Sequence, residues 1–335
     1  MPRALVTGGA GFLGGHLADA LAGAGFEVRL LDVAEPADTP YELVRGDVRD
    51  AGAVRRAVDG CEVVVDNAAL VPVTSSSAAE YRSVNVDGCR VTLEAARDSG
   101  AYALHISSSA IFGLPTRLPV TRATPLRPFE PYGASKAEAE RVVAELRGHG
   151  MTIGSLRPRT LLGAGRLGIF DVIFARVRAG RRVPLFGRGD NRIQLCAVED
   201  FCAAAVAAVE RRTGSDFNIG AGEFGTVRED IEALIDHAGT GARPIGIPVW
   251  ALRAAMQPMA LVGASPLSSW HWRTAPMSFY FDLSDARREL GWEPRYSNAQ
   301  ALARAYDAYL ASPGAAGEST HTRSLSGLVG RLLRS

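Results

Sequence analysis

Tyr132 and Lys136 are the side chains whose types and spacing best suit acid–base chemistry. They lie four residues apart in a stretch, residues 132–147, whose pattern predicts a helix, so both are expected on one helical face. A lysine ammonium beside a phenol favours the phenolate, and such a tyrosine can exchange a proton with a substrate hydroxyl near neutral pH. Many surface helices contain this spacing, so the interpretation depends on whether the preceding chain forms a site for a hydride acceptor.

A glycine-rich turn near the N-terminus predicts such a site. Residues 3–7 form an apolar run typical of a buried parallel strand, and residues 16–24 have a helical pattern. Between them, residues 7–14 read Thr-Gly-Gly-Ala-Gly-Phe-Leu-Gly, a variant of the dinucleotide-binding fingerprint. The glycines allow the backbone to approach a pyrophosphate, which the helix N-terminus attracts. The cofactor contacts expected from this turn are Gly8, Gly11, Phe12, Leu13 and Gly14.

Acidic residues end the next two predicted strands. Asp32 follows residues 27–31, where a carboxylate accepts hydrogen bonds from the adenosine ribose and repels a 2′-phosphate. This favours NAD over NADP. Asp47 and Val48 end a strand predicted over residues 41–48 and are placed at the adenine, although an ordinary turn aspartate fits Asp47 equally well.

Two later strand ends complete the expected site. The strand predicted over residues 61–66 leads to Ala68 and Ala69, which are small enough to let the backbone approach the cofactor. The strand predicted over residues 101–106 leads to three serines at 107–109, where doubly wound sheets bind ligands. One of these hydroxyls can orient a reacting oxygen toward Tyr132, although serine-rich strand ends are also common as plain loops.

Composition excludes several other classes of protein. The 335 residues are 47% hydrophobic, which suits a globular α/β protein, and Lys+Arg 37 against Asp+Glu 36 gives no basic field for nucleic acid. The four cysteines form no C-x-x-C pair, so we expect neither a metal site nor disulfides, but free thiols in a reducing cytoplasm. No apolar run is long enough for a transmembrane helix, and the N-terminus lacks a signal-peptide pattern.

Taken together, these motifs resemble the extended short-chain dehydrogenases/reductases of the NAD-dependent epimerase/dehydratase family, over nearly all of residues 1–311. Further matching blocks read Asn-Val-Asp-Gly at 85–88, Leu-Arg-Pro at 156–158, Val-Glu-Asp at 198–200, Phe-Asn-Ile-Gly at 217–220 and Leu-Gly-Trp at 290–292. The resemblance implies an α/β fold, a Rossmann-type doubly wound parallel sheet with a smaller, mostly helical C-terminal substrate domain.

The resemblance also implies domain boundaries. We expect an NAD-binding domain over residues 1–165 and 193–225, interleaved with a substrate-binding domain over 166–192 and 226–311. Residues 312–335 are expected to form a flexible tail, although leucines at helical spacing there could also contact a membrane or a partner.

In such enzymes Tyr132 would be the acid/base, while Lys136 would hold the ribose and tune Tyr132. The assisting hydroxyl lies five residues before the last glycine of its motif, Gly113, which selects Ser108; Pro158 would contact the cofactor. Tyr132 would take the proton of a hydroxyl while the carbinol hydride passes to C4 of NAD, leaving a ketone. Return of the hydride to either face gives epimerisation, whereas release of NADH gives dehydrogenation.

Departures from the family pattern narrow the expected reaction. Family dehydratases and decarboxylases carry an acid just after the active hydroxyl residue, where this chain has Ser109 and Ala110. The usual diphosphate-binding arginine is replaced by Ile193, with arginines nearby. The predicted substrate-binding residues are Ser108, Ser109, Arg159, Arg188, Arg192 and Arg273.

These features favour a nucleotide-sugar 4-epimerase, expected by analogy to be a homodimer that packs through the helix carrying Tyr132. The alternative is a 3β-hydroxysteroid-dehydrogenase-like enzyme of a hydrophobic alcohol or ketone. It is suggested by an apolar helix predicted over residues 248–262 and by aromatic residues at 270–272, both of which also suit plain core packing. A non-enzymatic NAD sensor is disfavoured because Ser108, Tyr132 and Lys136 are all present.

Overall fold

A seven-stranded parallel sheet forms the centre of the computed structural model, which describes residues 1–36, 38–72, 76–165, 169–251, 254 and 274–311. In spatial order the strands are β10 (Asp216–Ile219), β6 (Ile153–Pro158), β5 (Tyr102–Ile106), β4 (Val63–Asp66), β1 (Arg3–Thr7), β2 (Glu27–Asp32) and β3 (Glu42–Arg45). The strands β1 to β5 were predicted within a few residues, because they are short apolar runs bounded by turn residues. The predicted doubly wound α/β sheet is confirmed.

The strand order reverses between β1 and β4. β1 pairs with β2 on one side and with β4 on the other, and the chain then builds outward in both directions. Loops that leave β1 and β4 therefore diverge and leave a crevice at the carboxyl ends of these strands. The glycine turn follows β1 and Asn67 follows β4, so the topology brings both to this crevice.

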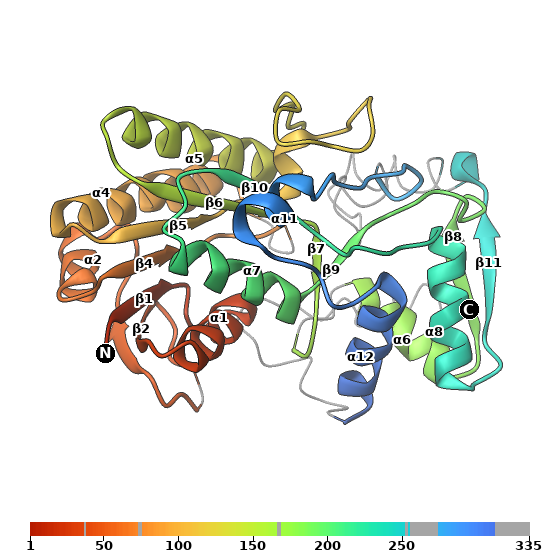
Figure 1. Ribbon diagram of the computed structural model, residues 1–335. Coiled ribbons are helices and arrows are strands. Elements are labelled where there is room, and N and C mark those ends of the chain that lie inside the picture. The colour runs from red at the N-terminus through yellow and green to blue at the C-terminus, as the bar shows by residue number, and fades with distance from the viewer. Residues whose placement is uncertain (37, 73–75, 166–168, 252–253, 255–273, 312–335) are drawn as a thin grey trace.

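Helices cover both faces of the sheet (Figure 1). One face packs against α2 (Ala51–Val58), α4 (Cys89–Ser99) and α5 (Pro131–Gly148), and the other against α1 (Phe12–Gly23) and α7 (Val198–Glu210). Residues of β1 alternate between the two cores: Ala4 and Val6 join one cluster, and Leu5 joins the other. Burial on both faces explains why the strands are continuously apolar.

The sequence pattern over residues 79–99 predicts one long helix, but a π-helical turn interrupts it. The structure has α3 (Ala78–Arg82), the π turn Ser83–Gly88 and then α4. The wider turn carries Asn85, which is 1% exposed, into the interior. Such turns often mark functional sites, because they redirect one side chain without ending the helix.

The remaining elements form a second cluster beside the sheet, on the right in Figure 1. It contains helices α6 (Ile169–Arg178), α8 (Val227–Ala238) and α12 (Asn298–Ala311). It also contains two pairs of strands: β7 (Thr160–Leu162) with β9 (Leu195–Ala197), and β8 (Arg182–Phe186) with β11 (Arg243–Ile247). From the sequence, residues 181–192 are dense in Arg and Gly and predict a loop, which is wrong for β8. Val183 and Leu185 alternate inward there, a short pattern that surrounding arginines and glycines obscured.

Part of the C-terminal region packs against the face of the central sheet that α1 and α7 cover. Phe279, Phe281 and Trp292 share a buried cluster with α1 and α7, and α11 (Ser284–Leu290) lies between them in sequence. The proposed domain boundaries therefore remain a prediction. Most of the apolar stretch 248–262, the aromatic residues at 270–272 and the tail after residue 311 lie outside the described residues.

All four cysteines are buried and free, as their spacing predicted. Among the described residues, no helix is both long enough and apolar enough to cross a bilayer.

Buried charges fasten α5 to the sheet. Arg157 of β6 donates hydrogen bonds to Glu140 of α5, with Nε 2.8 Å from Oε1, and to Asp216 of β10, with Nη2 2.7 Å from Oδ2. Burial opposes the charge on Arg157, but these two carboxylates hold the pKa of its guanidinium above the ordinary value. Glu140 also accepts a 2.5 Å hydrogen bond from the Ser107 hydroxyl, so one carboxylate ties the helix to two strand ends.

Replacing Glu140 with Gln should lower the free energy of unfolding by about 2–4 kcal/mol, because Arg157 would lose one partner of a buried charge network. Urea unfolding followed by circular dichroism measures this. Glu138→Gln on the same helix is the control, since Glu138 pairs with Arg82 at the surface and should change stability by less than about 1 kcal/mol. Equal unfolding midpoints for Glu140→Gln and the unmodified protein would show that the network does not stabilise the fold.

Candidate active site

The glycine turn between β1 and α1 forms one wall of the crevice. Gly8 has φ +68°, a conformation that favours glycine, and its amide donates to the carbonyl of Leu31 at 2.8 Å. A Cβ at Gly14 would lie 2.1 Å from the Gly8 carbonyl oxygen, so only glycine lets α1 begin this close to the turn. The N-cap residue of α1 is Gly11, which has no side chain to cap the helix, and helix N-termini of this kind bind anions.

Asp32 lies at the carboxyl end of β2, beside this turn. Its carboxylate accepts hydrogen bonds from the amides of Ala10 at 3.0 Å and Ala34 at 2.9 Å, which fix its orientation. Asp32 lines the crevice and is largely buried. This arrangement fits the ribose of NAD, because a buried carboxylate at this point accepts hydroxyl donors and repels a phosphate.

Asp47 and Val48 also line the crevice, at the loop that follows β3. Both oxygens of Asp47 accept hydrogen bonds from the Arg49 side chain, and these bonds hold the pKa of the carboxyl below its ordinary value. Asp47 is thus engaged by Arg49, so any contact of this carboxylate with adenine would be shared with that ion pair.

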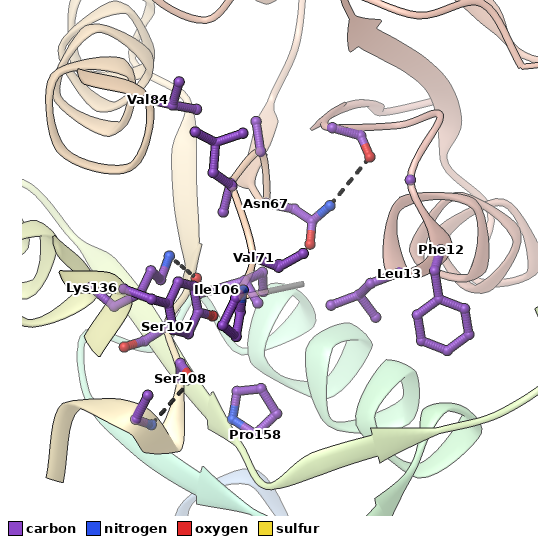
Figure 2. Close-up of a pocket in the computed structure, with 18 of the residues that line it drawn as sticks. Phe12, Leu13, Asn67, Val71, Val84, Ile106, Ser107, Ser108, Lys136 and Pro158 are labelled. Atoms are coloured by element: carbon purple, nitrogen blue, oxygen red, sulfur yellow. Dashed lines mark hydrogen bonds between the residues drawn. The ribbon is translucent and has the colours of Figure 1, made fainter. Parts of the chain in front are cut away.

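The turn after β4 closes the crevice from the other side. The Thr7 hydroxyl accepts hydrogen bonds from the amides of Asn67 and Ala68, both at 3.0 Å. Figure 2 shows the Asn67 side chain directed at the glycine turn, and its Nδ2 donates to the carbonyl of Thr7 at 3.1 Å. These bonds hold the two crevice walls together, with Ala68 and Ala69 in the lining.

Tyr132, Lys136 and Glu140 lie on one face of α5, because they are spaced at four-residue intervals. Lys136 is 3% exposed, and its ammonium donates a 2.6 Å hydrogen bond to the carbonyl of Ile106 at the end of β5 (Figure 2). Tyr132 and Lys136 both line the crevice. The ring of Tyr132 packs edge-on against the buried Tyr81, at a centroid distance of 6.0 Å.

The three serines after β5 have different partners. Ser107 is tied to Glu140, and Ser109 accepts a 3.0 Å hydrogen bond from Nη1 of Arg159. Ser108 is partly exposed in the crevice, and its hydroxyl accepts a 3.2 Å hydrogen bond from the Ala110 amide (Figure 2). A hydroxyl that accepts from an amide still has its proton to donate, so Ser108 can bind a substrate oxygen.

Asn85 is a site residue that the sequence analysis did not single out. Its side chain exchanges two hydrogen bonds with the backbone of Leu70, at 2.7 and 3.1 Å, and donates to the Ser135 hydroxyl at 3.0 Å. Ser135 in turn donates to the Tyr132 carbonyl at 2.8 Å. Asn85 therefore connects the loop after β4 to the first turn of α5 and positions Tyr132. The Asn-Val-Asp-Gly block at 85–88 was its only signal.

Glu130, the residue before α5, is a second residue that sequence reasoning missed. It lines the same cavity as Tyr132 and Ser108. The family pattern directed attention to positions 109 and 110, which hold Ser and Ala. An acidic residue lines the cavity on the tyrosine side instead.

The predicted substrate-binding arginines are dispersed. Arg159 lines the cavity, whereas Arg188 and Arg192 are not part of its lining. Arg192 stacks on Phe224 and Tyr280, and Arg188 is 89% exposed in its side chain. Arg273 lies outside the described residues. Gly14 is also behind the lining, where it serves the packing of α1.

One group of potential metal ligands occurs among the described residues. Atoms of Asp66, Cys89 and His105 lie within 4.8 Å of one another in the core. His105 Nδ1 lies 2.7 Å from Asp66 Oδ2. Burial disfavours the charged form of the Asp66 carboxyl, but this hydrogen bond helps hold its pKa below the ordinary value. Asp66 and Cys89 both contact Nδ1 of His105, whereas its Nε2 is buried without a hydrogen-bond partner among the described residues. None of the three residues belongs to the crevice lining.

The crevice is one cavity of about 430 Å³, within the range of ligand sites. Its lining contains the predicted residues Gly8, Gly11, Phe12, Leu13, Asp32, Asp47, Val48, Ala68, Ala69, Ser108, Ser109, Tyr132, Lys136, Pro158 and Arg159. Figure 2 shows Phe12 and Leu13 at one end and Lys136, Ser108 and Pro158 at the other. One end is thus backbone-rich and suits phosphates, while the other holds hydroxyl, ammonium and guanidinium groups.

Comparisons with known proteins agree with this geometry. The model of the NAD dependent epimerase/dehydratase family matches residues 4–220. A UDP-glucose 4-epimerase of Streptomyces lividans is 30% identical over 342 residues, covering 92% of this chain and 96% of the relative. A 4-hydroxy-2-methyl-3-oxo-4-farnesyl-3,4-dihydroquinoline-1-oxide ketoreductase of Stigmatella aurantiaca is also 30% identical, over 90% and 94% of the two chains.

The fold has close counterparts among solved structures. The UDP-glucose 4-epimerase of Thermotoga maritima, solved with UDP-glucose, superposes with a TM-score of 0.78, covering 93% of this chain and all of that chain, at 24% identity.

Gly14→Ala should weaken NAD binding by at least about tenfold, because the added methyl collides with the Gly8 carbonyl and displaces the turn. Titration calorimetry with NAD measures the change. Gly15→Ala is the matched control on the same helix, since a Cβ at Gly15 meets no atom within 4 Å and alanine favours the helix. Unchanged NAD affinity in Gly14→Ala would refute the assignment of this turn to the cofactor.

Proposed function

The chain belongs to the NAD dependent epimerase/dehydratase family and is an NAD-dependent enzyme, and we propose that its reaction is 4-epimerisation of a nucleotide sugar through a ketone. The observation that carries the proposal is that Tyr132, Lys136 and Ser108 line the same cavity as the glycine turn and Asp32. Hydride acceptor and proton acceptor would thus face one substrate hydroxyl. NAD, when bound, supplies the acceptor for the hydride.

The proton steps belong to side chains of this chain. Ser108 donates a hydrogen bond to the reacting oxygen and holds it against the Tyr132 phenol. Tyr132 takes the hydroxyl proton as the carbinol C–H bond breaks, and it returns that proton when the ketone is reduced. Lys136, held by the Ile106 carbonyl, places its positive charge where it stabilises the phenolate. Asn85 positions Tyr132 through Ser135.

We infer epimerisation rather than elimination because Ser109 and Ala110 stand where family dehydratases carry an acid, and the acidic residue Glu130 lines the cavity from the tyrosine side instead. In an epimerase the ketone is reduced again, and attack on its other face inverts the carbon.

The second candidate function is oxidation or reduction of a hydrophobic alcohol or ketone, as in a 3β-hydroxysteroid dehydrogenase. It is favoured by the relative named as a ketoreductase of a farnesylated dihydroquinoline and by the absence of Arg188 and Arg192 from the lining of the described cavity. In that case the same Tyr132 proton transfer would occur once in each turnover, with net release of oxidised or reduced cofactor.

We also infer a homodimer in the cytoplasm, in which α5 contributes to the interface. The family analogy would use the small residues Ala137, Ala139 and Ala144 of α5 for close packing; Ala137 and Ala139 are buried in this chain's own core, and Ala144 is exposed. The domain proposal assigns residues 166–192 and 226–311 to the substrate side.

Tyr132→Phe should lower kcat at least about 1000-fold while NAD binding changes by less than about twofold, because only the transferable proton is lost. Steady-state turnover assays measure kcat, and titration calorimetry with NAD measures the affinity for the cofactor. Tyr81→Phe is the control: it keeps the ring beside Tyr132 and removes the hydroxyl that donates a 3.3 Å hydrogen bond to the Val71 carbonyl. Retained activity in Tyr132→Phe would refute this tyrosine as the acid/base.

The two candidate functions predict different fates for the hydride. An epimerase keeps NAD bound, so we expect NAD to copurify, and UDP-sugar turnover to proceed with no net accumulation of NADH. Product chromatography together with NADH absorbance distinguishes the cases. Steady NADH formation from a lipophilic secondary alcohol, with no epimer formed from any nucleotide sugar, would reject the epimerase in favour of the dehydrogenase.

A further inference from the structure

Arg159 is a buried cation without an acidic partner among the described residues. Its residue is 6% exposed, and its two hydrogen bonds run to neutral oxygens: Nε to the Gln194 carbonyl at 3.2 Å and Nη1 to the Ser109 hydroxyl at 3.0 Å. The guanidinium carbon lies 4.0 Å from the ring centre of Phe279. A charge in this setting has lost its hydration and has gained no counter-charge.

The comparison with Arg157, two residues earlier, is direct. Arg157 is equally buried, but Glu140 and Asp216 balance its charge and hold its pKa above the ordinary value. For Arg159, burial lowers the pKa to about 9, so the side chain remains cationic at neutral pH with its charge uncompensated. The fold thus supplies carboxylates that neutralise the charge of Arg157, whereas the charge of Arg159 is left for a bound ligand to neutralise.

Arg159 keeps a donor that no described residue uses. Its Nη2 makes no hydrogen bond within the described part of the chain, and this atom is not sealed from solvent. Arg159 lines the cavity, as do Pro158 and Thr160. Its Nη1 donates to Ser109, which follows Ser108 in the chain, so the guanidinium is on the serine side of the cavity.

We propose that Arg159 binds a carboxylate of the substrate, so that the enzyme acts on a nucleotide sugar whose carbon 6 is a carboxylate; this rests on the proposed function. Arginine presents a planar fork that matches a carboxylate. The carboxylate of such a sugar is attached at carbon 5, next to the reacting carbon 4. The diphosphate is attached at the anomeric carbon, across the ring. A cation beside Ser108 and Ser109 therefore lies closer to the carboxylate.

The experiment compares three ligands on the NAD-loaded protein by titration calorimetry: UDP, UDP-glucose and UDP-glucuronic acid. The two sugars differ only in the group at carbon 6. We expect UDP-glucuronic acid to bind roughly 10- to 100-fold more tightly than UDP-glucose, because only its carboxylate can form a charged hydrogen-bonded pair with Arg159. Arg159→Met keeps the length and apolar contacts of the side chain, and it should abolish this preference while leaving UDP affinity unchanged.

Two further variants complete the test. Arg159→Lys keeps the charge without the fork and should retain a reduced preference, which separates charge recognition from a packing defect in Arg159→Met. Arg192→Met is the control at an exposed arginine outside the cavity lining; it should leave the ratio between the two sugars unchanged.

Each other outcome rejects a different statement. Equal affinity for both sugars in the unmodified protein would overturn the carboxylate site and leave the epimerase proposal standing. Weaker UDP binding in Arg159→Met would assign the guanidinium to the diphosphate and would also overturn it. If none of the three ligands bound, the nucleotide-sugar function itself would be rejected, and this inference with it.

Discussion

The site depends on how α5 is fixed against the carboxyl ends of β5 and β6. Two charged side chains on one helical face do this: Lys136 bonds the Ile106 carbonyl, and Glu140 bonds Ser107 and Arg157. Both contacts are buried, where unpaired charges are costly, so the helix has little freedom to slide or rotate. Tyr132 is one turn before Lys136, so the contacts of Lys136 and Glu140 also fix the position of Tyr132. The Glu140 contact fixes Ser107, the first of the three serines after β5.

The cofactor half of this site could be predicted because its determinants are local. Gly8 needs a left-handed backbone, Gly14 needs space, and Asp32 ends a strand, so each requirement is written in a few adjacent residues. The sheet was predictable for a similar reason, since parallel strands buried on both faces are apolar runs. Tyr132 and Lys136 also share a face by spacing alone.

The remaining features depend on contacts between distant segments. Asn85 acquires its role only because a π turn directs it inward to Leu70 and Ser135, and no local pattern predicts such a turn. The β8–β11 pair joins segments separated by a long stretch of chain, and its alternation is too short to detect. Glu130 lines the cavity from the residue just before α5, far in sequence from Ser108, so the pattern around Ser108 gives no sign of it.

Local determinants serve mainly the binding of the cofactor, whereas determinants from distant segments serve mainly the binding of the substrate. Binding a dinucleotide through backbone amides constrains glycines and leaves side chains few roles, so one motif serves many enzymes. Recognising a substrate needs charge and shape, which come from separate strands and loops. Arg157 and Arg159 illustrate the point: they are the same residue type, two positions apart, yet only the tertiary partners Glu140 and Asp216 distinguish a structural arginine from one free to bind a ligand. The role inferred for Arg159 therefore rests on contacts between distant segments, which the sequence alone does not show.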